Sequence, residues 1–147
     1  MTPNQEVLFE CEFDFDSLAV VAQKVADVLS QEDRFCVWLR GDLGAGKTTL
    51  VRHVLYALGL QDGYPVPSPT FAYMYEYAIR ETWYAHLDLY RGEELNLEDL
   101  GIVGYRRYGG YFVEWPEKMT DGDLPATHEI KLTHVSELSR SIIVTRL

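Results

Sequence analysis

The hydrophobic and polar positions of the first thirty residues follow two different periods. Every second residue from Val7 to Phe13 is apolar, and Glu10 and Glu12 lie on the other face, which predicts a half-buried strand. Asp14 or Asp16 is then placed to cap a helix. The buried stripe of that predicted helix comprises Leu18, Val21, Ala22, Val25, Val28 and Leu29.

A run that is apolar on both faces follows, from Phe35 to Leu39. Such a run is typical of a central strand covered by helices. A second helical stripe comes after it and ends at Gly59, a residue suited to the left-handed position at a helix C-terminus. The apolar positions of this second helix are Leu50, Val51, Val54, Leu55 and Leu58. The sequence therefore predicts strand, loop and helix in immediate succession.

Periodic segments continue through the second half of the chain. A strand is predicted at 71–77, another at 82–87 ending at Asp88, a short helix at 93–100, a strand at 111–113 ending at Glu114, and a hairpin with arms at 129–133 and 141–147. Proline-rich residues 61–70 are predicted to form a loop, and 121–125 a turn.

Composition and charge narrow the class of protein. The 147 residues are expected to form one domain, residues 1–147, and no apolar stretch is long enough to span a bilayer. The first residues lack the features of a signal peptide, and Cys11 and Cys36 show neither disulfide nor metal spacing, so we expect a cytoplasmic protein with no membrane partner. A net charge of −10 argues against a broad nucleic-acid surface. The pair Arg106–Arg107 is either a solvated loop or a local contact with a nucleic acid or partner protein.

The loop between the central strand and the second helix has the sequence GDLGAGKTT and matches the P-loop pattern G-x-x-x-x-G-K-[ST]. Its glycines allow successive backbone N–H groups to face a phosphate, and the following helix adds its own N–H groups and dipole. Lys47 is expected to bind the outer phosphates and Thr48 to bind Mg²⁺. The predicted nucleotide-binding residues are Gly41, Asp42, Leu43, Gly44, Ala45, Gly46, Lys47, Thr48 and Thr49.

Two carboxylates follow predicted strands and are candidates for hydrolysis. Asp88 is the better candidate for the Mg²⁺ site, and Glu114 for ordering the attacking water. From spacing alone each of them has a simpler alternative, a turn cap for Asp88 and a surface charge for Glu114. Thr70 is either a switch-like hydroxyl or a turn residue, and His86, on the face of Asp88, is more often a packed or hydrogen-bonded histidine than a ligand. The chain has no NKxD segment to read guanine, so ATP is favoured over GTP.

The order of several segments resembles the TsaE (YjeE) family of bacterial P-loop ATPases. They are GDLGAGKTT, SPTF at 68–71, HLDLYR at 86–91, LGI at 100–102 and VEWPEK at 113–118, and the resemblance covers nearly the whole chain. The segment between Ile102 and Glu114, with Gly109–Gly110, matches no family feature, and Leu87 stands where an aromatic residue is commoner.

The resemblance implies an α/β fold: a single compact P-loop NTPase-like domain whose central sheet, mostly parallel or mixed, is flanked by helices and followed by the C-terminal hairpin. It implies weak ATP hydrolysis that is stimulated by the TsaB–TsaD pair, which modifies tRNA adenosine, so that tRNA is reached through the complex. Carried over by position, Lys47 and Glu114 are catalytic, Thr48, Asp88 and Glu114 serve the Mg²⁺ site, and Thr70 binds the nucleotide as a switch-like residue; Trp115 lies beside the site. Two alternatives stay open: a small-molecule kinase, although no arginine-rich lid is evident, and an assembly module with negligible catalysis.

Overall fold

The computed structural model describes residues 5–67, 73–90, 108–119 and 124–147. Within these ranges the chain forms two α-helices, one short 3-10 helix and the strands of a single sheet. Their bounds in chain order are β1 Glu6–Asp14, α1 Leu18–Leu29, β2 Phe35–Arg40, α2 Lys47–Leu58, β3 Met74–Ile79, β4 Thr82–Asp88, β5 Gly110–Glu114, the 3-10 helix η1 Pro116–Lys118, β6 His128–His134 and β7 Ser139–Arg146.

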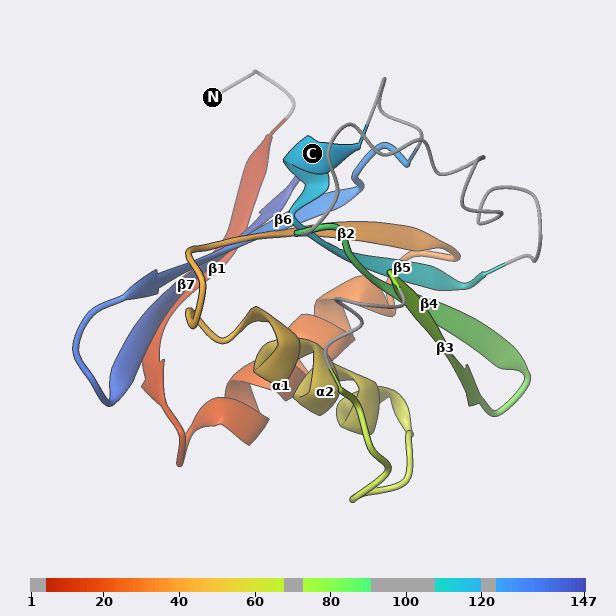
Figure 1. The fold of residues 1–147 in the computed structure, drawn as a ribbon, viewed down its shortest axis with the longest axis horizontal. Coiled ribbons are helices and arrows are strands. Elements are labelled where there is room, and N and C mark those ends of the chain that lie inside the picture. The colour runs from red at the N-terminus through yellow and green to blue at the C-terminus, as the bar shows by residue number, and fades with distance from the viewer. Residues whose placement is uncertain (1–4, 68–72, 91–107, 120–123) are drawn as a thin grey trace.

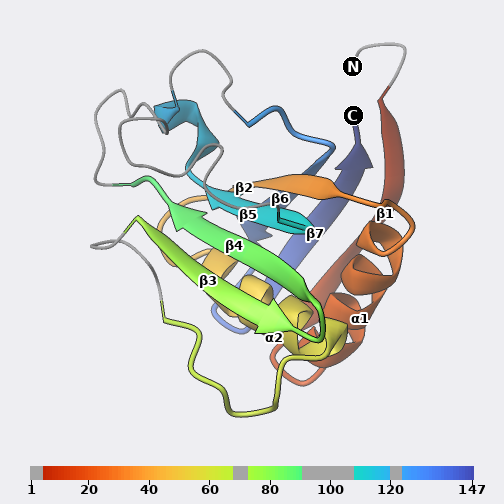
Figure 2. The same ribbon diagram turned by 90° about the vertical axis from the view of Figure 1, so that its right-hand side faces the viewer.

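The sheet has seven strands in the order β1-β7-β6-β2-β5-β4-β3 (Figures 1 and 2). The four middle strands, β6, β2, β5 and β4, are parallel to one another, and the outer pairs are antiparallel. The first and last strands are neighbours, with Glu6 opposite Arg146. The predicted mixed sheet, the central position of β2 and the C-terminal hairpin β6–β7 are therefore confirmed.

Both α-helices lie on the same face of the sheet (Figure 1). The alternating side chains of β2 explain why that strand is apolar throughout. Val37 and Leu39 belong to the core under the helices, whereas Cys36 packs in a second core on the opposite face. In the described residues that second core is completed by partly buried aromatic side chains such as Trp83 and Trp115 instead of an α-helix.

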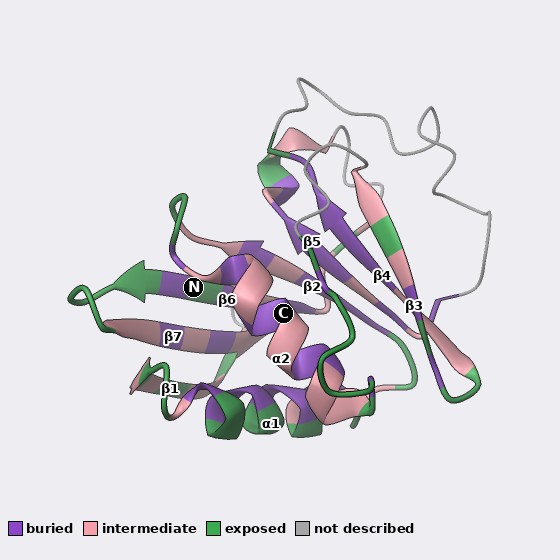
Figure 3. Ribbon diagram, turned by 60° about the horizontal axis from the view of Figure 1, so that its bottom comes forward, coloured by how far each residue is buried: buried purple, intermediate pink, exposed green. Residues whose placement is uncertain are grey.

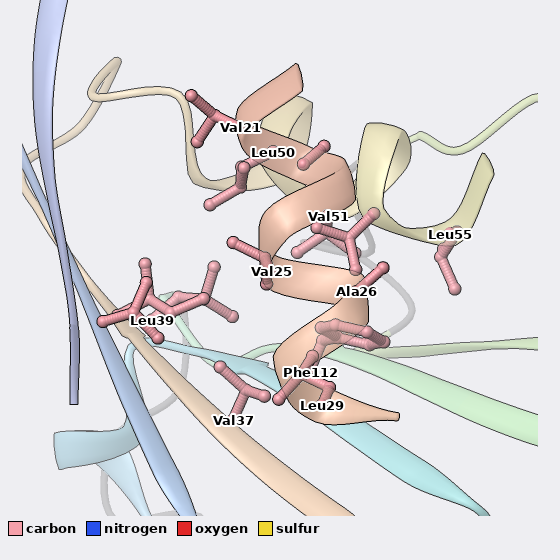
Figure 4. Packing of buried hydrophobic residues seen from close by; sticks show 14 of the residues in the cluster. Val21, Val25, Ala26, Leu29, Val37, Leu39, Leu50, Val51, Leu55 and Phe112 are labelled. Atoms are coloured by element: carbon pink, nitrogen blue, oxygen red, sulfur yellow. The ribbon is translucent and has the colours of Figure 1, made fainter. Parts of the chain in front are cut away.

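The main core forms where the apolar stripes of α1 and α2 meet the sheet. Figure 4 shows Val25 and Leu29 of α1 beside Val37 and Phe112 of the sheet, and all four are almost completely buried. Each such side chain contributes about 1.5–3 kcal/mol when it leaves water. The side of α1 that faces away from the sheet is exposed (Figure 3). The buried stripe includes Ala26 in place of the predicted Val28, which is only half-buried.

The start of α1 differs from the prediction. Neither Asp14 nor Asp16 is the N-cap; Ser17 occupies that position. Asp14 acts one step earlier, because its Oδ1 accepts hydrogen bonds from the backbone N–H and the hydroxyl of Ser17, both at 3.0 Å. These bonds close the turn between β1 and α1 and hold the pKa of Asp14 below its ordinary value. The aspartate therefore fixes the turn that leads into the helix.

Strand boundaries also differ at two places. The register of β1 against β7 shifts between Val7 and Phe9, so Val7 is 46% exposed and does not share the half-buried face of Phe9. Strand β3 begins at Met74, and Tyr73 before it has a positive φ of 63°. The predicted strand start at Phe71 lies outside the described residues, as do the predicted helix 93–100, Thr70, the pair Arg106–Arg107 and most of the turn 121–125.

The glycine pair that matched no family feature has a packing role. A Cβ at Gly110 would lie 2.2 Å from the ring of Phe35, its pairing partner on β2. A Cβ at Gly109 would lie 2.3 Å from the methyl group of Thr82. A side chain at either position would force the Phe35 ring or the Thr82 methyl group to shift, so the two glycines allow β5 to begin close to β2 and β4. None of the described helices is long and apolar enough to cross a membrane.

Candidate active site

The loop after β2 has the backbone that phosphate binding requires. Gly46, just before α2, has φ 100°, a left-handed conformation that is open to glycine and costly for most residues. Helix α2 then begins at Lys47, so its first N–H groups have no partner within the helix and face the loop. Cβ atoms built at Gly44 and Gly46 would meet nothing within 4 Å. The loop is thus an open cradle at the positive end of a helix.

The parallel middle strands bring two carboxylates to the edge of the sheet where this loop begins. Asp88 ends β4 and Glu114 ends β5, and the two residues are direct partners in the β4–β5 ladder. Both are nearly buried, with 4% and 3% of their surface exposed. A buried carboxylate needs strong partners, so the groups around these two residues determine what they can do.

A cavity of about 260 Å³ joins the cradle to the carboxylates. It brings together the four residues that the sequence predicts for chemistry, Lys47, Thr48, Asp88 and Glu114. The full lining is Leu43, Gly44, Gly46, Lys47, Thr48, Thr49, Asp88, Tyr90, Glu114 and Trp115.

Glu114 is held between α2 and β4. The Thr48 hydroxyl lies 3.0 Å and 2.8 Å from the two carboxylate oxygens and donates to them. On the other side, His86 Nε2 lies 2.6 Å from Glu114 Oε2. His86 is completely buried. Two groups therefore fix the Glu114 carboxylate. A bound metal would take up the Thr48 hydroxyl, whereas the bond from His86 would remain.

Lys47 lies within the loop that carries it. Its ammonium group donates to the carbonyl oxygen of Gly41 and, at 3.1 Å, to that of Asp42. It also lies 4.3 Å from the centre of the Trp115 ring, within the range of a cation–π interaction. Burial lowers the pKa of Lys47, and the nearby Glu114 and Asp88 carboxylates oppose that shift. A charged, nearly buried lysine is thereby kept beside the open cradle.

The turn after β4 builds the remaining wall. The Tyr90 backbone N–H donates to Asp88 Oδ1 at 3.0 Å, which fixes that carboxylate. The Tyr90 ring lies 4.9 Å from the Trp115 ring, centre to centre. Trp115 has φ 59° and ψ 53°, a strained conformation for a non-glycine residue, directly after Glu114. This strained residue aims a large ring at the ammonium of Lys47.

Not every predicted site residue lines this cavity. Ala45 is buried beneath the loop, and Gly41 and Asp42 face a separate cavity beside Leu132. Thr70 lies outside the described residues. The sequence assigned no role to two further residues, Tyr90 and His86. Both lie in the segment HLDLYR that carries the resemblance, and His86 also alternates with Asp88.

A second cavity, of about 310 Å³, adjoins the first across the loop. The two cavities share Gly44, Gly46 and Thr49. Its walls include the apolar side chains of Phe15 and Leu138, which are 77% and 82% exposed. The two cavities thus adjoin at the loop: the first is polar at the carboxylates, and the second combines apolar side chains with Asp14, Glu137 and Arg140.

The oxygen atoms present suit one kind of metal. Within the described ranges no three His, Cys, Asp or Glu side chains are grouped as an all-protein metal cage. Mg²⁺ does not need such a cage, because it usually takes one or two protein oxygens together with waters and substrate phosphates. The Thr48 hydroxyl and the Asp88 carboxylate, on the same cavity, are hard oxygen donors of this kind.

Comparison with known proteins gives a consistent result. The family model described as Threonylcarbamoyl adenosine biosynthesis protein TsaE matches residues 14–142. The Haemophilus influenzae tRNA threonylcarbamoyladenosine biosynthesis protein TsaE is 39% identical over 107 residues, or 69% of this chain and 66% of that protein. The Aquifex aeolicus protein of the same name is 32% identical over 97% of this chain and 96% of its own length. The crystal structure of Bacillus subtilis YdiB shares the fold, with a TM-score of 0.67 at 23% identity, over 96% of this chain and 88% of that one.

Proposed function

Because the chain belongs to the TsaE family, we propose that it is a Mg²⁺-dependent ATPase that serves threonylcarbamoyl adenosine biosynthesis in tRNA together with TsaB and TsaD. The observation that carries the ATPase proposal is the first cavity. There the P-loop residues Lys47 and Thr48 face the strand-end carboxylates Asp88 and Glu114. A binding loop alone would need no buried carboxylate pointed at it.

The residues present fit ATP and Mg²⁺. The open space over Gly44 and Gly46 leaves room for phosphate oxygens against the backbone. Thr48 and Asp88 supply the oxygen ligands for the metal, and Lys47 supplies a positive charge for the outer phosphates. When bound, Mg²⁺ supplies positive charge that offsets the phosphate oxygens and the leaving group.

The residues of this chain then have separate roles. Lys47 exchanges the carbonyl oxygens of Gly41 and Asp42 for phosphate oxygens, since its ammonium already lies beside the cradle. Thr48 would give up its bonds to Glu114 if its hydroxyl were to hold the metal. Glu114 is then free to accept a hydrogen bond from a water and to orient that water toward the terminal phosphorus. The Trp115 ring covers the side of Lys47 and excludes solvent there.

The second cavity is the place we propose for the nucleotide base. It continues from the phosphate cradle through shared residues, and its exposed Phe15 and Leu138 offer flat apolar surface to a purine. Base stacking on an aromatic side chain contributes about 1–3 kcal/mol. The proposed base site therefore explains why Phe15 and Leu138 are exposed at this edge of the sheet.

The deciding experiment measures phosphate release from ATP by the purified protein with Mg²⁺, first alone and then with TsaB, TsaD and tRNA. We expect slow turnover alone and a clear increase when the partner pair is added. Omission of Mg²⁺ should abolish both rates.

Two results would contradict the proposal. A saturating TsaB–TsaD pair that neither binds the protein nor changes its turnover would remove the proposed role with these partners. Turnover that depends on a small hydroxyl or phosphate acceptor, in a screen of such compounds, would identify a small-molecule kinase instead.

A further inference from the structure

His86 is a completely buried titratable side chain that the proposed chemistry does not use. It lies two residues before Asp88 on β4 and opposite Phe112 on β5, two positions before Glu114 in the ladder. None of its surface is exposed, and its Nε2 lies 2.6 Å from Glu114 Oε2. Its other ring nitrogen, Nδ1, has no hydrogen-bond partner in the part of the chain that the structure describes.

Packing alone does not explain a histidine at this position. A buried ring nitrogen without a partner reduces stability, and an apolar side chain of similar size would fill the same space without that cost. The remaining nitrogen forms a short bond to the one carboxylate proposed to order water. The neighbouring side chains on this face of β4 and β5, such as Tyr84 and Phe112, pack in the apolar core under the helices. His86 is therefore a polar residue beside apolar neighbours on this face, and its ring contacts Glu114.

We propose that His86 is a positioning residue that holds the Glu114 carboxylate in its water-orienting position while ATP and Mg²⁺ are bound. In this structure Glu114 is fixed from two sides, by Thr48 and by His86. The proposed function, on which this inference rests, removes the Thr48 bond, because that hydroxyl turns to the metal. His86 Nε2 is then the contact that keeps Glu114 from rotating, and a misdirected carboxylate no longer orients the water.

The test compares two substitutions at the same position. Gln places a side-chain N–H near the position of His Nε2, whereas Leu fills space without a donor. We expect His86→Leu to lower the partner-stimulated kcat by about 10- to 100-fold, the usual effect of losing a group that orients an active-site ligand. ATP affinity should stay within a few-fold of wild type, and His86→Gln should restore a large part of kcat.

His128 supplies a matched control. It is also a completely buried strand histidine with one ring nitrogen that has no hydrogen-bond partner among the described residues, but it lies on β6 and its Nδ1 contacts the Thr127 hydroxyl. His128→Gln should leave kcat unchanged even if it lowers the melting temperature. In a Glu114→Gln background, His86→Leu should have no further effect on kcat, because the proposed role acts only through Glu114.

Three results would overturn the proposal. They are an unchanged kcat in His86→Leu, a loss in ATP affinity as large as the loss in kcat, and a stable His86→Gln variant as inactive as His86→Leu.

A second measurement separates this inference from the proposed function. If the wild-type protein shows no ATP turnover with its partners, the proposed function fails, but the His86 contact is still tested by NMR. We expect a hydrogen-bonded ring proton on His86 Nε2 in the wild-type protein and its loss in Glu114→Ala. A ring proton that is indifferent to Glu114→Ala would overturn the positioning role whatever the turnover.

Discussion

At the scale of single residues, Lys47 forms hydrogen bonds to carbonyl oxygens that phosphate oxygens would replace. Its ammonium donates to two carbonyl oxygens of its own loop and lies over the Trp115 ring. We expect Lys47→Ala to weaken ATP binding by roughly 10- to 100-fold, since a charge-assisted hydrogen bond contributes about 1.5–3 kcal/mol. Calorimetric titration with ATP and Mg²⁺ measures this. An unchanged affinity would mean that the phosphates bind elsewhere.

Glu114 should affect the rate of ATP hydrolysis and not the affinity for ATP. Glu114→Gln keeps the shape and a hydrogen-bonding oxygen but removes the charge that orients and deprotonates water. We expect hydrolysis to slow by about 100-fold or more, with ATP affinity near that of wild type. Single-turnover hydrolysis and equilibrium binding, measured on the same preparation, separate the two. An equal loss of both would reassign Glu114 to metal binding or to the core.

Phe15 tests the location of the base. Its ring is 77% exposed on the second cavity, so truncation removes little from the core. Phe15→Ala should weaken ATP binding by about 1–3 kcal/mol and leave the binding of inorganic triphosphate unaltered. Val20, on the exposed side of α1 and 61% exposed, provides a control; Val20→Ala should change neither affinity.

The sequence predicts some of these residues better than others. Lys47 and Thr48 follow from a local pattern, because loop and helix are consecutive in the chain. Glu114 and Asp88 follow from their positions at strand ends. The contact between His86 and Glu114 depends on which strands are neighbours, and spacing along one strand does not contain that information. The sequence therefore predicts a packed or hydrogen-bonded histidine at position 86 but does not identify Glu114 as its partner.

At the scale of elements, the start of β5 depends on the absence of a side chain. The Phe35 ring occupies the space where a Cβ of Gly110 would lie. We expect Gly110→Ala to lower the free energy of unfolding by about 1–3 kcal/mol, the usual cost of overpacking a core. Urea denaturation measures this change. In the double variant with Phe35→Leu the two losses should sum to less than their separate values, and strict additivity would contradict the proposed clash.

Element types were predictable where one period dominates and less so where the backbone deviates. The two helices and β4 were predicted nearly at their observed bounds, because their apolar stripes are long and regular. The bulge in β1 and the late start of β3 were not predicted. A register shift at Val7 and a positive φ at Tyr73 leave no mark in an alternating pattern. The placement of both helices on one face likewise depends on connections between distant segments.

At the scale of the whole molecule, stability should depend on pH through His128. Burial lowers the pKa of this histidine below its ordinary 6.5. Between the two values the unfolded chain binds a proton that the folded protein excludes, so the free energy of unfolding falls as the pH drops below about 6.5. The slope is at most about 1.4 kcal/mol per pH unit from this group. Chemical denaturation of wild type and His128→Gln between neutral and mildly acidic pH should give a steeper decline for wild type; equal slopes would contradict the prediction.

The neighbourhood of β1 and β7 has a consequence for how the chain reaches its native state. The strand at Glu6–Asp14 has its only ladder in the described sheet with the strand at Ser139–Arg146, and β2 pairs with β5 and β6, which come much later in the chain. Contacts of such long sequence separation slow folding, because a large loop must close before they form. On the ribosome, the P-loop strand therefore emerges long before its neighbours, and the nucleotide site is completed only after nearly all of the chain has been synthesised.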